Sequence, residues 1–151
     1  GERAESRERD GPRLSGLFDT EPWGGASGPA YFNCVLTGRT RLGPMEVLQA
    51  CRRVEAAAGS RVRKAGAPRR LDVDLLCMEG AVSSPPDLEL PHPRMHLRRF
   101  VLIPLSQVWV GEVPGLGANP ERLLKKIADS GSVVELQPPP SVGATAWKEG
   151  E

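Results

Sequence analysis

The segment from residue 71 to residue 76 constrains the fold of this chain most strongly, because apolar and acidic residues alternate along it. Such alternation is typical of a β-strand with one face buried and one face exposed. Asp72 and Asp74 would then project from the same face, with their Cα atoms about 6.6 Å apart at two strand steps of roughly 3.3 Å each. The pattern therefore predicts a strand that presents two carboxylates next to each other.

Two neighbouring carboxylates on a strand could hold one or two divalent cations, since two-metal sites place the ions about 3.5–4 Å apart. Mg²⁺ in particular prefers one or two carboxylates together with the phosphates of a substrate. Arg69 and Arg70 directly precede the segment and add positive charge next to it. The combination indicates phosphoryl transfer. The alternative is that the two aspartates are solvated surface residues that pair with an arginine.

Two further groups of cationic residues flank this segment. Residues 59–68 include Arg61, Arg63 and Lys64, with Gly59 at one end and Gly66 and Pro68 at the other. We expect a lid whose guanidinium groups bind phosphate and which excludes water when it closes. The second group, after Pro91, consists of His92, Arg94, His96, Arg98 and Arg99. Its density of positive charge indicates an anion site, although ordinary solvated cations would produce the same pattern.

Composition fits one soluble domain, with 151 residues and a formal net charge of +1. That charge argues against bulk affinity for nucleic acid. Cys34, Cys51 and Cys77 are odd in number and each follows or precedes apolar residues, so we expect small buried side chains in a reducing compartment. No apolar run reaches the roughly 18 residues of a membrane span, and no signal peptide is visible. We therefore expect a cytoplasmic protein.

The remaining pattern predicts an α+β sandwich, with helices on a mainly antiparallel sheet. Pro44 suits the first turn of a helix and Gly59 its end, with Val47, Leu48, Cys51, Val54 and Ala58 on one side. The other expected elements are strands at 14–19, 30–37 and 100–105, a helix at 121–129 and a loose tail from residue 137. In the strand at 30–37, Phe32, Cys34 and Leu36 would share one face.

The order of these motifs resembles that of the hydroxymethyldihydropterin pyrophosphokinases of folate biosynthesis. The similar segments are Leu-Phe-Asp-Thr-Glu-Pro-Trp-Gly (17–24), Tyr-Phe-Asn (31–33), Gly-Pro-Met-Glu-Val-Leu (43–48), Arg-Val-Glu (53–55), Pro-Arg-Arg-Leu-Asp-Val-Asp (68–74), Leu-Pro-His-Pro-Arg (90–94) and Arg-Phe-Val-Leu-Ile-Pro-Leu (99–105). Each segment alone is a weak signal, whereas all of them in this order are specific. The resemblance implies a ferredoxin-like α-β sandwich and transfer of a diphosphate from ATP to 6-hydroxymethyl-7,8-dihydropterin, with release of AMP.

The resemblance also implies a role for each matching residue. Asp72 and Asp74 would bind two Mg²⁺ ions on the ATP phosphates, and Arg63 and Arg69 would contact the transferred diphosphate. The expected ATP-binding residues are His92, Arg98 and Arg61, and the expected pterin-binding residues are Thr20, Tyr31, Asn33 and Phe100. Tyr31 and Phe100 would sandwich the ring, while Asn33 and the backbone near Thr20 would read its edges. The partners would be ATP and the pterin, without nucleic acid or membrane, and the protein would act as a monomer.

Three features depart from the family pattern. The usual first strand and its Gly-Ser-Asn-Leu-Gly segment are missing, so we expect residues 1–136 to form an N-terminally incomplete pyrophosphokinase-like domain, followed by a flexible tail at 137–151. The lid lacks its usual tryptophan. Arg52 stands where a glutamine is common, and Ser60 is an additional residue. Two alternatives remain: a truncated or divergent relative that binds ATP or pterin without turnover, and a basic module that binds RNA.

Overall fold

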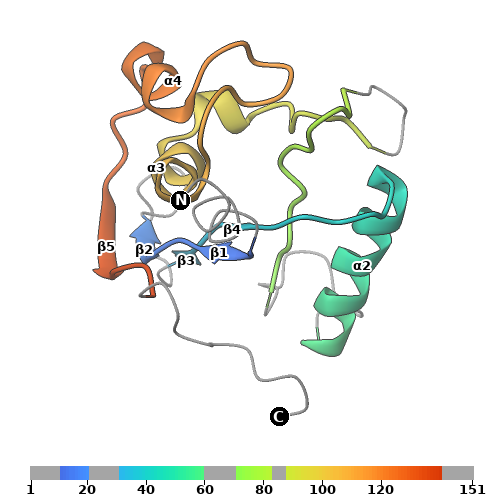
Figure 1. Cartoon of the computed structure of the whole chain (residues 1–151). Helices are drawn as coiled ribbons and strands as arrows, with labels where there is room; N and C mark the ends of the chain where they lie inside the picture. The colour runs from blue at the N-terminus through green and yellow to red at the C-terminus, as the bar shows by residue number, and fades with distance from the viewer. Residues whose placement is uncertain (1–10, 21–30, 60–70, 83–87, 141–151) are drawn as a thin grey trace, which may run out of the picture. The chain divides into compact units, whose positions relative to one another are not determined.

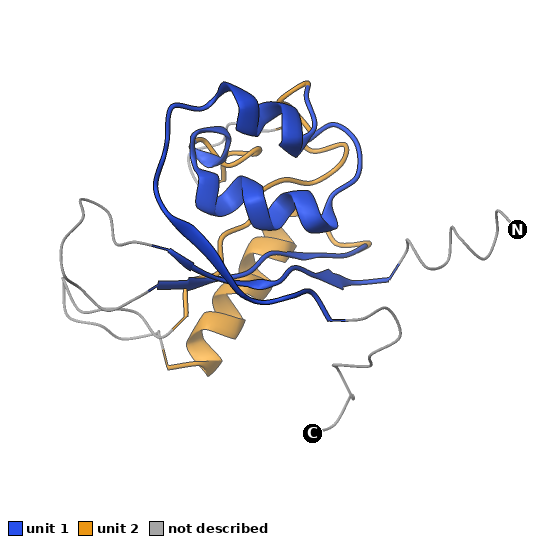
Figure 2. Ribbon diagram, turned by 90° about the vertical axis from the view of Figure 1, so that its left-hand side faces the viewer, with its two compact units in different colours: residues 1–39, 94–113, 118–151 blue, residues 40–93, 114–117 orange. Residues whose placement is uncertain are grey.

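The computed structural model describes residues 11–20, 31–59, 71–82 and 88–140. The chain divides into two units, which Figure 2 distinguishes by colour. The first unit comprises residues 1–39, 94–113 and 118–151, and the second comprises residues 40–93 and 114–117. Residues 60–70, which include all of the expected lid (59–68) except Gly59, lie outside the described part of the chain.

In its described residues, the first unit has five short strands in two antiparallel sheets (Figure 1). Strand β1 (Arg13–Leu14) pairs with β4 (Leu36–Thr37). Strand β2 (Leu17–Thr20) lies between β3 (Tyr31–Asn33) and β5 (Val133–Gln137). The predicted strands at 14–19 and 30–37 are thus confirmed as extended segments that pair with each other, although each is interrupted once.

The interruption is a β-bulge, where residues 15–17 stand opposite only residues 34–35. Ser15 bridges the gap, because its amide donates to the Val35 carbonyl at 2.8 Å and its hydroxyl accepts from the Val35 amide at 2.7 Å. The Gly16 amide leaves the ladder and donates to Oε1 of Gln107 at 2.8 Å. A bulge of this kind bends the strand and re-aims the side chains beyond it, here those of β2.

Helix α3 (Arg99–Val108) packs on β2 and β3, and helix α4 (Pro120–Lys126) packs on α3 (Figure 1). The predicted strand at 100–105 is therefore wrong. Leu102, Leu105 and Val108 recur every three residues and are all buried, which is the pattern of a helix with one face in the core. Pro104 suggested a broken strand, but it is buried inside the helix, where packing outweighs its missing amide donor.

The second unit contains helix α2 (Pro44–Ala57), the element predicted best from the sequence. Pro44 opens it, and Gly59 ends it with a positive φ of 86° that favours glycine. Val54, expected on the apolar side, is exposed to 52% of its surface. Segment 71–77 has no regular secondary structure, so the prediction of a strand at 71–76 is wrong. No strand in the described ranges pairs with it, and a strand requires such a partner.

Three smaller expectations also differ from the structure. Phe32 and Leu36, expected to share a face, belong to strands of different sheets, and both are exposed. Cys34 is exposed while Cys51 and Cys77 are half-buried, so the prediction of buried cysteines is wrong for Cys34. The helix expected at 121–129 ends at Lys126. Gln137, where a loose tail was expected to begin, pairs with Leu17 as the last residue of β5, and residues 141–151 lie outside the described part of the chain. The α+β class with antiparallel sheets is confirmed.

Candidate active site

Three of the predicted pterin-binding residues lie together on β2 and β3 in the first unit. Thr20 and Tyr31 are direct partners in the strand register, and Asn33 is two residues further along β3. Nδ2 of Asn33 donates to Oγ1 of Thr20 at 2.8 Å, and the Thr20 hydroxyl in turn donates to the Tyr31 carbonyl at 3.4 Å. Thr20 is buried, so this bond holds the amide of Asn33 in one orientation.

The two predicted aromatic residues come from different elements of the same unit. Tyr31 on β3 is exposed to 53% of its surface, which is unusual for an aromatic residue that only fills a core. Phe100 is half-buried in the first turn of α3, the helix that packs on β3. The guanidinium of Arg98 lies 5.5 Å from the centre of the Phe100 ring. A cation at this distance attracts the ring, so Arg98 and Phe100 hold each other in place.

The two aspartates lie in the second unit, in segment 71–77. Asp72 and Asp74 are both exposed while Val73 and Leu75 are half-buried, so the predicted alternation holds over residues 72–75, but Leu71, expected on the buried face, is exposed. Among the described residues, no cluster of three or more histidine, cysteine, aspartate or glutamate side chains could hold a metal. Two carboxylates that need further oxygen ligands from a phosphate fit Mg²⁺, and they do not fit a cation that requires a complete protein cage.

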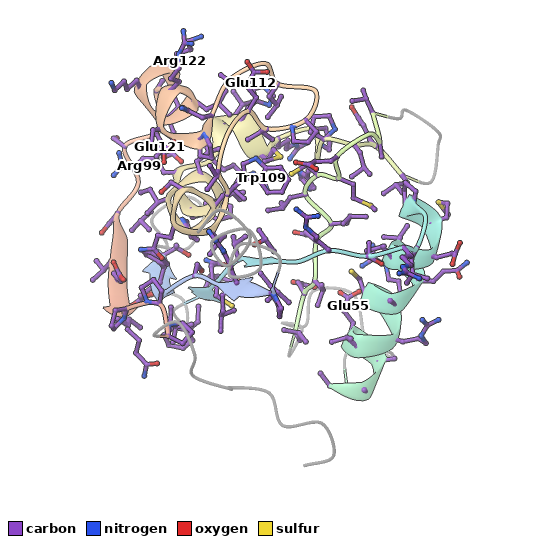
Figure 3. All side chains as sticks on the ribbon, viewed as in Figure 1. Glu55, Arg99, Trp109, Glu112, Glu121 and Arg122 are labelled. Atoms are coloured by element: carbon purple, nitrogen blue, oxygen red, sulfur yellow. The ribbon has the colours of Figure 1, made fainter. Side chains whose placement is uncertain are left out.

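Arg52 and Glu55 on α2 bind the backbone between these aspartates. The sequence analysis did not assign either residue to the site. Glu55, which Figure 3 labels on α2, is exposed to only 5% of its surface. It accepts from Nη1 of Arg52 at 2.5 Å and from the Val73 amide at 3.3 Å, and Nη1 of Arg52 also donates to the Val73 carbonyl at 3.4 Å. The signal was present in the sequence, because Glu55 falls on the apolar side of the helix, one turn after Cys51.

The charge of Arg52 interacts favourably with those of Glu55 and Asp74. The hydrogen bond to Glu55 raises the pKa of Arg52, and the negative charge of Asp74 raises it further. Arg52, which carries its charge at all physiological pH values, offsets part of the negative charge at Asp74.

The predicted phosphate-binding residues lie in different parts of the chain: one in each unit, and three outside the described residues. His92 lies in the second unit, where its amide donates to the Leu76 carbonyl at 2.7 Å and so ties the loop after Pro91 to the aspartate segment. Arg98 belongs to the first unit. Arg61, Arg63 and Arg69 lie outside the described residues.

Comparison with known proteins adds independent information. The sequence profile of the 7,8-dihydro-6-hydroxymethylpterin-pyrophosphokinase (HPPK) family matches residues 3–110. A 2-amino-4-hydroxy-6-hydroxymethyldihydropteridine pyrophosphokinase of Methylorubrum extorquens is 35% identical over 114 residues, which cover 76% of this chain and 72% of that protein. The protein of the same name from Porphyromonas gingivalis is 38% identical over 100 residues, which cover 63% of this chain and 67% of the relative.

A longer relative also matches. A folic acid synthesis protein of Dictyostelium discoideum is 28% identical over 130 residues, which cover 85% of this chain but only 20% of that protein. The chain thus spans a fifth of this relative and about seven tenths of the bacterial ones. Within the described ranges, the helices are all too short or too polar to cross a lipid bilayer.

Proposed function

Because the chain belongs to the 7,8-dihydro-6-hydroxymethylpterin-pyrophosphokinase family, we propose that it transfers a diphosphate from ATP to 6-hydroxymethyl-7,8-dihydropterin and releases AMP. The observation that carries the proposal is the match over residues 3–110, a range that includes every site residue expected from the sequence. This is a step of folate biosynthesis.

Asp72 and Asp74 would hold two Mg²⁺ ions together with the ATP phosphates. When bound, Mg²⁺ neutralises charge on the phosphate oxygens and orients them. Exposure of both carboxylates supports this role, because the side chains are accessible to a nucleotide. Arg63 and Arg69 would contact the transferred diphosphate, where guanidinium forks match phosphate oxygens. His92, Arg98 and Arg61 would bind the rest of the triphosphate.

The pterin would be recognised by its edge and by its faces. Asn33 carries both a donor and an acceptor, which match the heterocycle edge. Its bond to the buried hydroxyl of Thr20 supports this assignment, because a fixed amide loses little entropy when it binds. Tyr31 and Phe100 would stack on the two faces of the ring.

In the proposed reaction, the hydroxymethyl oxygen of the pterin forms a bond to the β-phosphorus of ATP. The bond between that phosphorus and the oxygen bridging to the α-phosphate breaks, and AMP leaves with the bridging oxygen. The hydroxyl proton passes to solvent. Positioning and charge neutralisation account for most of the rate enhancement in phosphoryl transfer, so the chemistry requires no strong base.

The proposal is tested by incubating the protein with ATP and Mg²⁺ and measuring the release of AMP with and without 6-hydroxymethyl-7,8-dihydropterin. The double variant Asp72→Ala/Asp74→Ala is the control. Pterin-dependent AMP that disappears in the double variant would support the proposed activity. Folded protein that binds ATP or pterin but releases no AMP would instead identify a binding protein without turnover.

A further inference from the structure

The backbone around Val73 is held on both sides by one ion pair. Its amide belongs to the peptide link with Asp72, and its carbonyl belongs to the peptide link with Asp74. Glu55 accepts from that amide at 3.3 Å, and Arg52 donates to that carbonyl at 3.4 Å. Arg52 and Glu55 also bind each other, one turn apart on α2. Both peptide links that connect the aspartates are therefore bound by side chains of a single helix.

Burial of the charged Glu55 side chain costs free energy. A side chain that only filled space at this position would not carry that cost. Glu55 is the only charged side chain among the buried residues of the described ranges. An ionised carboxylate is expensive to bury unless it is paired and hydrogen-bonded, and an apolar side chain at the same place would fill the space without that cost. The two partners of Glu55 named above offset the cost, and one of them is the backbone between the aspartates.

Segment 71–77 is not held in place in the way that a β-strand is. A strand is held by a ladder of backbone bonds on a neighbouring strand, and the described residues contain no strand paired with 71–77. Within the described residues, side-chain bonds at Val73 and the bond from the His92 amide to the Leu76 carbonyl contribute to holding it. The bonds at Val73 act on the two peptide links that connect the aspartates.

We propose that Arg52 and Glu55 form a positioning pair, which sets the spacing and direction of Asp72 and Asp74 and so determines how tightly the protein–nucleotide complex binds its divalent ions. This inference deepens the proposed function and rests on it. Neither Arg52 nor Glu55 needs to touch a metal or a substrate. Loss of a group that orients a metal ligand typically weakens metal binding by about 10–100-fold, which sets the expected size of the effect.

The test measures Mn²⁺ binding by electron paramagnetic resonance in the presence of α,β-methylene-ATP, which cannot release AMP. We expect Glu55→Ala and Arg52→Ala to weaken Mn²⁺ binding by about tenfold or more. Arg52→Gln retains a donor for the Val73 carbonyl, so it should lose less than Arg52→Ala. Glu46→Ala and Arg53→Ala are matched controls on the exposed side of α2 and should remain within about twofold of the wild type.

A purely structural role is separated from positioning by thermal unfolding of the same variants. Arg52 is exposed to 56% of its side-chain surface, so its variants should fold even if Glu55→Ala does not. Unchanged Mn²⁺ binding in Arg52→Ala would overturn the positioning role, provided that Asp72→Asn/Asp74→Asn abolishes binding. If wild-type protein binds no Mn²⁺ with the nucleotide, or if the aspartate variants bind it normally, the proposed metal site itself is wrong and the positioning role falls with it.

Discussion

Replacement of Gly16 by alanine should destabilise the first unit, because a side chain at this position has no space. A Cβ atom built on Gly16 would lie 2.5 Å from the Gln137 carbonyl oxygen and 2.7 Å from Oε1 of Glu135. Ordinary van der Waals contact begins near 3.4 Å, so the backbone of β5 would have to move by about 0.9 Å, the difference between 3.4 Å and 2.5 Å. Overpacking of this kind typically costs about 1–3 kcal/mol.

Urea unfolding of Gly16→Ala and of the control Gly38→Ala measures this cost. Among the described residues, the Cβ of Gly38→Ala would meet only Pro12 atoms at 3.9 Å, an ordinary contact. The control should therefore change the free energy of unfolding by less than about 1 kcal/mol, and Gly→Ala can even stabilise by restricting the unfolded chain. Equal stability of the two variants, or a Gly16→Ala protein as stable as the wild type, would refute the close approach of β5 to the bulge.

The site and the cysteines support further predictions. In steady-state kinetics, Asn33→Ala should raise the KM for pterin at least about tenfold and change the KM for ATP little. The reason is that loss of a hydrogen bond to the edge of the pterin costs at least about 1.4 kcal/mol. Tyr31→Ala should raise the same KM about tenfold, since stacking of a heterocycle on an aromatic ring contributes roughly 1–3 kcal/mol. Burial raises the pKa of the Cys77 thiol to about 11. A thiol reagent at pH 8 should therefore label the exposed Cys34 first and Cys77 only after unfolding. The folded protein then binds more protons than the unfolded chain between pH 9.0 and about 11, so the stability contributed by Cys77 should fall as the pH rises through this range.

Sequence reasoning succeeded where local chemistry decided the structure. Helix α2 carries its own signals, with Pro44 at the start and Gly59 at the end, and both act as predicted. The family resemblance, not the alternation, implied the grouping of Thr20, Tyr31 and Asn33, and the strand register brings the three residues together. These features depend on residues close in sequence or on one hairpin-like pairing.

Sequence reasoning failed where distant contacts decided the structure. Because proline is unfavourable inside a helix, Pro104 made a helix at 100–105 unexpected. Burial of Leu102 and Leu105 nevertheless stabilises a helix there. Segment 71–76 has the alternation of a strand, but alternation cannot supply a pairing partner. The place of Glu55 on the apolar side of α2 signals a buried charge, but its contact with Val73, 18 residues away, cannot be read from the sequence of that helix.

The central claim is that this chain transfers the β- and γ-phosphates of ATP together to a pterin alcohol. ³¹P nuclear magnetic resonance of a reaction with ATP, Mg²⁺ and 6-hydroxymethyl-7,8-dihydropterin tests it most directly, because it identifies both products in one sample. We predict AMP and a pterin diphosphate in equal amounts with wild-type protein, and neither with Asp72→Asn/Asp74→Asn. Formation of ADP with a pterin monophosphate, or unchanged ATP in the presence of folded protein, would contradict the account.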